Sequence, residues 1–169
     1  KALTGVYASD SGTITVAGKP VIFRNTSDAQ AAGISTVYQE VNLCPNLSVG
    51  EYVMLGHEPR RGGRIDWKGV HVRAAEHLDG LGLRIDTRTM LSSHSLAIQQ
   101  LVAISRAMVL DSRVLILDEP TSSLDRGEVE QLFAVVRDLR ASGVAILFVS
   151  HFLEQVYEIA DCVTVLRNG

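Results

Sequence analysis

Three short apolar runs in the C-terminal part of the chain, separated by two amphipathic segments, restrict its fold more than any other feature. The runs are Val114 to Leu117, Ala145 to Val149 and Val163 to Leu166. Each run has the length of a strand, and apolar residues recur at helical spacing between the runs. The order strand, helix, strand, helix, strand is typical of a parallel sheet. We therefore expect an α/β fold in which the first two of these strands are buried.

The composition is that of one globular domain. The chain has 169 residues, of which 46% are hydrophobic and 21% charged, and its net charge is −3. This balance excludes an intrinsically disordered segment and gives no support for nucleic-acid binding. The longest apolar run, Val144 to Val149, is far shorter than the roughly 20 residues of a membrane-spanning helix. Any membrane association is therefore expected to come through a partner. Cys44 and Cys162 form no CxxC pair, so we expect a reducing cytosol.

Turn and capping signals predict the elements of the N-terminal part. Residues 13 to 23 consist of two apolar or alternating runs around an Ala-Gly-Lys-Pro turn, which predicts an antiparallel β-hairpin. Ser27 and Gln30 have the spacing of a capping box, which predicts a short helix that starts just after Ser27 and ends near Gly33.

The middle of the chain carries further helix signals. Ser48 and Glu51 repeat the capping-box spacing and predict a helix over residues 49 to 55. Residues 58 to 66, EPRRGGRID, have the composition of a mobile surface loop, and Asp66 can cap the helix that follows. Apolar residues at helical spacing predict two longer helices, through Val70, Ala74, Leu78 and Leu81 and through Ala97, Leu101, Ile104 and Met108.

Polar residues that could carry chemistry follow the first two predicted parallel strands. Asp118 and Glu119 end the first strand, and His151 lies just beyond the second. An isolated Asp-Glu pair is more often a solvated turn, and a lone histidine at a strand end is more often structural. The carboxyl ends of parallel strands lie at one edge of the sheet, however, so the three side chains are expected to meet there. Adjacent carboxylates, one for Mg²⁺ and one to polarise water, indicate nucleotide hydrolysis.

The motif around these carboxylates resembles a known family. The stretch VLILDEPTSSLD, from Val114 to Asp125, is similar to the Walker B motif and D-loop of the nucleotide-binding subunit of ABC transporters. Gln39 in STVYQEVNL matches the Q-loop glutamine of that family, and ILFVSH, which ends at His151, matches its switch-histidine strand.

The resemblance implies an α/β fold of the P-loop NTPase type: a parallel sheet core with an antiparallel β hairpin and a helical subdomain. It implies a single truncated ABC ATPase domain over residues 1–169. Residues 1–47 and 111–169 would form the core, and residues 48–110 the helical subdomain.

The resemblance also implies roles for the site residues. Glu119 would activate water, Asp118 and Gln39 would serve Mg²⁺, and Gln39 and His151 would contact water or the γ-phosphate of ATP. Gln39 would further lie where the membrane subunit docks. Asp125, in the D-loop, would contribute to nucleotide binding.

The family's signature motif, a Leu-Ser-x-Gly type of sequence before Gln-Gln, corresponds here to His-Ser-Leu-Ala-Ile-Gln-Gln at residues 94–100. Ala97 replaces the glycine, and His94 replaces the leucine. In this family the signature caps the γ-phosphate of a nucleotide bound to the opposite domain. The matching nucleotide-binding positions are Ser95, Ala97 and Gln99. The structural alternative is that residues 95–109 are only an amphipathic helix.

No phosphate-binding loop of the form GxxxxGK[ST] occurs in the sequence. Gly18-Lys19 is followed by Pro20, where this motif needs Ser or Thr, and position 13 is not Gly. By resemblance, that loop would lie upstream of Lys1, and its strand would lie between those at 145–149 and 163–166. We therefore expect the chain alone to be inactive, and to rearrange its core or self-associate.

Several segments are similar to monosaccharide importers of the ribose and galactose type, among them AAGISTVYQEVNLCPNLSVGEYVMLG and GGRIDW. In that branch one polypeptide carries two such domains, and this chain is most similar to the first. The resemblance implies an ATPase subunit that couples Mg-ATP hydrolysis to sugar import on the cytoplasmic face of the bacterial inner membrane. Its partners would be transmembrane permease subunits, a second ABC ATPase domain and, indirectly, a sugar-binding protein, with no nucleic acid. The alternatives are a degenerate regulatory domain and a soluble ABC ATPase that acts on ribosomes or nucleic acid.

Overall fold

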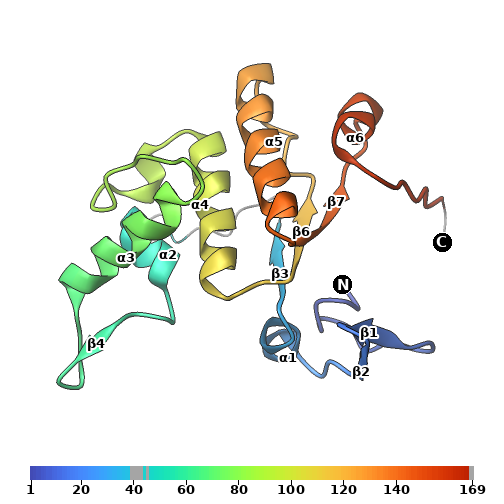
Figure 1. The fold of residues 1–169 in the computed structure, drawn as a ribbon, viewed down its shortest axis with the longest axis horizontal. Helices are drawn as coiled ribbons and strands as arrows, with labels where there is room; N and C mark the ends of the chain where they lie inside the picture. Colours follow the sequence, from blue (N-terminus) through green and yellow to red (C-terminus); the bar gives the residue numbers. More distant parts are fainter. Residues whose placement is uncertain (39–43, 45, 168–169) are drawn as a thin grey trace.

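A parallel three-stranded sheet forms the centre of the computed structural model, which describes residues 1–38, 44 and 46–167. Its strands are β3 (Ile34–Val37), β6 (Val114–Asp118) and β7 (Ala145–Val149), in the order β3-β6-β7. Helix α5 (Arg126–Ala141) provides the crossover from β6 to β7 and lies beside the sheet (Figure 1). The parallel α/β core that the strand and helix pattern predicts is therefore confirmed.

The two faces of the sheet are covered by different parts of the chain. Leu115 and Leu117 are fully buried in a large apolar cluster that includes residues of α5 and of the helices described below. Ile116 points to the opposite face and packs in a second cluster with Phe23 and Ala29. Because side chains alternate along a strand, the continuous apolar run of β6 fills both clusters.

β7 is less buried than its sequence predicts. Ile146 and Phe148 are half-buried against the large cluster, whereas Leu147 and Val149 on the other face are 44% and 42% exposed. The elements that cover the second face reach β3 and β6 and leave β7 open. The expectation that β7 is a fully buried strand is therefore wrong, because the cover of the second face stops at β6.

The strand expected over Val163 to Leu166 is also absent. These residues have no regular secondary structure, and Val165 and Leu166 are 81% and 84% exposed. An apolar run becomes a strand only where a neighbouring strand offers hydrogen bonds, and no strand of the described chain lies beside it. The sheet nevertheless keeps the order β3-β6-β7, so the rearranged core that we expected is not found in the described residues. Self-association stays a prediction.

Two antiparallel hairpins lie outside the sheet. β1 (Ile14–Val16) pairs with β2 (Lys19–Val21), which confirms the hairpin predicted at residues 13 to 23. β4 (Arg60–Arg61) pairs with β5 (Arg64–Ile65), where the sequence predicted only a loop. Gly62 and Gly63 have φ of 58° and 78°, and a two-residue turn with positive φ at both positions favours pairing of the flanking residues.

Five more α-helices surround these elements. They are α1 (Thr26–Ala31), α2 (Val49–Met54), α3 (Trp67–Asp79), α4 (Leu96–Val109) and α6 (Leu153–Ile159), with a 3₁₀ turn at Leu91–Ser93. The capping box of Ser48 and Glu51 is present as predicted. Helix α1 instead begins after Asn25, whose side chain accepts from the Asp28 N–H at 2.9 Å. Ser27 is therefore not its cap, because Asn25 satisfies the free N–H groups first.

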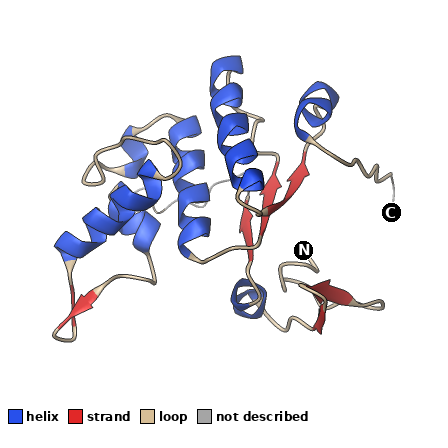
Figure 2. Ribbon diagram, viewed as in Figure 1, coloured by secondary structure: helices blue, strands red, loops and turns tan. Residues whose placement is uncertain are grey.

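Helices α2, α3 and α4 gather on one side of the sheet (Figure 2). Val49, Val70 and Leu78 are fully buried among them. Their apolar cluster is continuous with the one that covers β6, so one core joins these helices to the sheet. The division into a core and a helical subdomain at residues 48–110 stays a prediction. In the described part of the chain, no helix has the length and apolar character needed to cross a membrane.

Phe133 of α5 holds the edge strand against the helix. It is fully buried, and its ring meets that of Phe148 in β7 edge-on, with centroids 5.9 Å apart. Phe133→Ala is expected to lower the free energy of unfolding by about 3–5 kcal/mol, because it leaves a cavity. Urea denaturation followed by circular dichroism measures this loss. Ile22→Ala, at a residue that is 88% exposed, is the control and should change stability by less than about 0.5 kcal/mol.

Candidate functional site

The carboxyl ends of β6 and β7 bring together the polar residues that the sequence singled out. Asp118 is the last residue of β6 and pairs with Val149 of β7. Glu119 follows with φ of 51°, and its N–H donates to the Val149 carbonyl at 2.9 Å. The left-handed region is uncommon for a residue with a side chain. This backbone turn ends β6 abruptly and ties Glu119 to the end of the neighbouring strand.

Glu119 and His151 form the central pair of the site. Nδ1 of His151 donates to Oε1 of Glu119 at 2.9 Å, since a carboxylate can only accept, and the same Nδ1 lies 2.8 Å from Oε2. The Oε2 contact lacks hydrogen-bond geometry, and Oε2 is buried with no other partner among the described residues. The Glu119 side chain is 20% exposed, against 66% for His151. A partly exposed carboxylate that is oriented by an imidazole is able to accept a proton from a bound water.

A second bond joins the same two segments. Thr121, which is 3% exposed, donates from Oγ1 to Oε1 of Gln155 in α6 at 2.6 Å. Sequence reasoning missed this pair. No local pattern marks it, because the two residues are distant in sequence and meet only when β7 is placed beside β6.

The head of α4 carries the signature positions. Ser95 is exposed and caps α4 through its side chain, whereas Ala97 is only 2% exposed. Gln99 donates from Nε2 to the His94 carbonyl at 2.7 Å. Nε2 of His94 lies 2.7 Å from Oγ1 of Thr89, whose hydroxyl proton is donated to the Asp86 carbonyl. The helix of the structural alternative is therefore present, and its first turn is organised by side chains.

Asp125 lies at the start of α5 and is not part of the Glu119–His151 contact. Asp125 is exposed at the start of α5 and forms a capping box with Glu128, which explains its residue type structurally. Gln39 lies outside the described residues. The structure therefore brings together Asp118, Glu119 and His151, while Ser95, Ala97, Gln99 and Asp125 lie at the N-terminal ends of α4 and α5. Within the described ranges, no group of three or more His, Cys, Asp or Glu residues is arranged to hold a metal ion.

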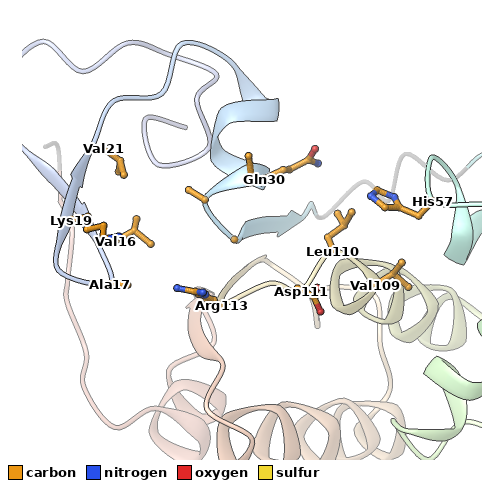
Figure 3. A pocket seen from close by; sticks show the side chains of 13 residues that line it. Val16, Ala17, Lys19, Val21, Gln30, His57, Val109, Leu110, Asp111 and Arg113 are labelled. Atoms are coloured by element: carbon orange, nitrogen blue, oxygen red, sulfur yellow. The ribbon is translucent and has the colours of Figure 1, made fainter.

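A cavity lies at the other end of the sheet. It has a volume of about 700 Å³ and is lined by the β1–β2 hairpin, the end of α1 and the turn between α4 and β6 (Figure 3). Gly33 and Arg113, which precede β3 and β6, form part of its wall. It contains none of the predicted site residues, so the chemistry must be sought at the carboxyl ends of the strands.

Comparison with known proteins identifies the family. Residues 1–122 match the ABC transporter family. This chain belongs to the ABC transporter family. Solved structures show the same fold at low sequence identity. A nucleotide-free ATP-binding cassette from an ABC transporter superimposes with a TM-score of 0.79 at 20% identity, over 95% of this chain and 67% of that one. A dimeric cassette bound to ADP and phosphate gives 0.70 at 22% identity, over 90% of this chain and 68% of that one.

Curated relatives of this ABC domain are sugar transport proteins. The fructose import ATP-binding protein FruK of Bifidobacterium longum (strain NCC 2705) is 65% identical over 100% of this chain and 33% of its own length. The galactofuranose transporter ATP-binding protein YtfR of Escherichia coli (strain K12) is 53% identical over 100% of this chain and 34% of its own. The chain thus spans about a third of the length of these relatives. The predicted family and the predicted fold are both confirmed.

Proposed function

We propose that this ABC domain is part of the ATP-hydrolysing subunit of a bacterial sugar importer, in which closure and hydrolysis drive transport. The observation that carries the proposal is the Glu119–His151 pair at the sheet edge, next to Asp118. A carboxylate that is 20% exposed and oriented by an imidazole suits a base that activates water. The names of the relatives, which transport or import sugars, support the sugar as cargo.

The residues at this edge fit Mg²⁺ and ATP. Asp118 is a half-buried carboxylate at the end of β6, and Glu119 follows it directly. Carboxylate oxygens are the ligands that Mg²⁺ prefers. We propose that Asp118, together with Gln39, would hold Mg²⁺, which when bound neutralises charge on the phosphates of ATP. Glu119 would take the proton of the attacking water, and His151 would orient Glu119 and contact the γ-phosphate.

The partners that we propose follow from a role in a sugar importer. A second ABC domain would present its nucleotide to Ser95, Ala97, Gln99 and Asp125. Permease subunits would dock near Gln39. Tyr38, which precedes it in the sequence, lines a cavity of about 210 Å³ together with Tyr52. Arg106 also lines this cavity and stacks on the Tyr52 ring, 5.0 Å from its centroid. A sugar-binding protein would act through the permease, on the far side of the inner membrane. No nucleic acid is involved.

Reconstitution tests this function. The complete protein and its permease, placed in lipid vesicles with the cognate binding protein, should hydrolyse ATP faster when the sugar is added. Fructose, ribose, galactose and galactofuranose form the first panel. His151→Ala should abolish the stimulation. ATP binding without turnover would support a degenerate regulatory domain instead, and stimulation by ribosomes alone would support the soluble ABC ATPase.

Ala97→Gly in the complete protein tests the signature assignment. We expect ATPase activity to stay equal or to rise, because the backbone can then approach a phosphate more closely. Ala97 lies in the first turn of α4, so the helix should lose up to about 1 kcal/mol. Ala103→Gly on the same helix is the control, with a similar cost in stability and no change in activity. A large loss of activity from Ala97→Gly would show that this residue does not stand in for the signature glycine.

A further inference from the structure

Helix α6 has little apolar packing on the domain, where its last residue, Ile159, is half-buried against the large apolar cluster. It begins two residues after His151, and none of its residues is buried. Phe152, its N-cap residue, makes no capping bond through its side chain. Figure 1 shows α6 beyond the edge strand β7, at the side of the sheet. Because the apolar contact of Ile159 lies at the C-terminal end of α6, we expect polar contacts to fix the N-terminal part of the helix, and with it the position of His151.

Among the described residues, three polar side-chain contacts link α6 and the turn after it to the rest of the domain. Two are ion pairs with α5, Arg137–Glu158 at 2.8 Å and Arg140–Asp161. Their side chains are about half exposed or more, and such ion pairs contribute little to stability. The third is the hydrogen bond from Thr121 to Gln155. This hydrogen bond differs from the ion pairs because its donor residue, Thr121, is only 3% exposed. A buried donor that loses its partner is costly.

The Thr121–Gln155 bond is placed to act on the catalytic pair. Thr121 follows Glu119 by two residues, and Gln155 follows His151 by four, which is about one helical turn. The bond therefore joins the same two segments as the Glu119–His151 contact. With the backbone bond from Glu119 to Val149, these contacts connect the segment after β6 to the end of β7 and to α6 on both sides of the Glu119–His151 pair.

We propose that Thr121 and Gln155 are positioning residues that hold His151 against Glu119. The proposal rests on the proposed function, since it concerns the rate of ATP hydrolysis. Thr121 supplies the proton and Gln155 the acceptor oxygen. Without this bond, the N-terminal part of α6 loses its side-chain link to the segment that follows β6, and His151 leaves the carboxylate. Neither residue is assigned a contact with the nucleotide, so the loss should appear in kcat and not in KM for ATP.

Conservative variants of the complete protein separate this role from a general loss of structure. Thr121→Val keeps the shape but removes the donor, and we expect kcat to fall about five- to tenfold with KM for ATP unchanged. Thr121→Ser keeps the donor and should restore kcat to within about twofold. Gln155→Leu should reproduce the effect of Thr121→Val from the other partner. Glu158→Gln, which weakens an exposed ion pair of the same helix, is the matched control and should leave kcat unchanged.

A double-mutant cycle with His151→Ala decides whether Thr121 acts through the imidazole. In that background we expect Thr121→Val to cause no further loss of kcat in single-turnover measurements, because the group that it positions is gone. Independent, multiplicative losses would overturn the proposal, and so would normal kcat in Thr121→Val or in Gln155→Leu. If Thr121→Val fails to fold, the double-mutant cycle is measured with Gln155→Leu and His151→Ala instead. Normal kcat in His151→Ala would instead refute the proposed function itself, so the two failures are distinguishable.

Discussion

Glu119→Gln in the complete protein is expected to bind ATP normally and to hydrolyse it at least about a hundredfold more slowly. The amide keeps the size and shape of the carboxylate, but it cannot accept a proton from the attacking water. The site shows why the effect should be this large. The Glu119 side chain is 20% exposed and is oriented by Nδ1 of His151, which places it to take that proton. Isothermal titration calorimetry measures ATP binding, and phosphate release measures turnover.

Asp118→Asn provides the comparison for this prediction. Asp118 ends β6 and is assigned to Mg²⁺, so its amide variant should weaken binding of Mg-ATP, with less effect on nucleotide binding without Mg²⁺. The two neighbouring substitutions should therefore differ in kind, one in the rate of hydrolysis and the other in metal-dependent affinity. Normal turnover by Glu119→Gln would refute the assignment of Glu119 as the base.

The 169-residue chain itself is expected to show no affinity for Mg-ATP at millimolar nucleotide. Its sheet edge presents Asp118 and Glu119, and carboxylates without nearby cationic donors repel a triphosphate. The sequence has no GxxxxGK[ST] loop, so it offers neither the cradle of N–H groups nor the lysine that would neutralise this charge. Calorimetric titration of the chain with Mg-ATP is the measurement.

The complete protein, titrated under the same conditions, is the control for this experiment and should bind. Circular dichroism must first show that the chain is folded, so that an absent signal reports on the site. Tight binding of Mg-ATP by the chain alone would contradict the argument, since it would require a phosphate site that the sequence does not contain.

The elements that could be predicted from the sequence are those whose signals are local. Capping interactions act within one helical turn, so Ser48 with Glu51, and likewise Asp66, mark helix starts in the sequence and in the structure alike. The run from Val114 to Leu117 identifies a central strand because both of its faces meet apolar side chains. The meeting of Glu119 with His151 was also predictable, because parallel strands place their carboxyl ends at one edge.

Only the tertiary structure decided the features that depend on neighbours distant in sequence. Val163 to Leu166 has the composition of a strand but lacks a strand beside it, and β7 is half exposed because the cover of the second face stops at β6. The positive φ of Glu119 and the Thr121–Gln155 bond carry no local signal. Periodicity and capping report what a segment can form within its own few residues. Pairing, burial and the orientation of a catalytic side chain are set by the segments that fold against it.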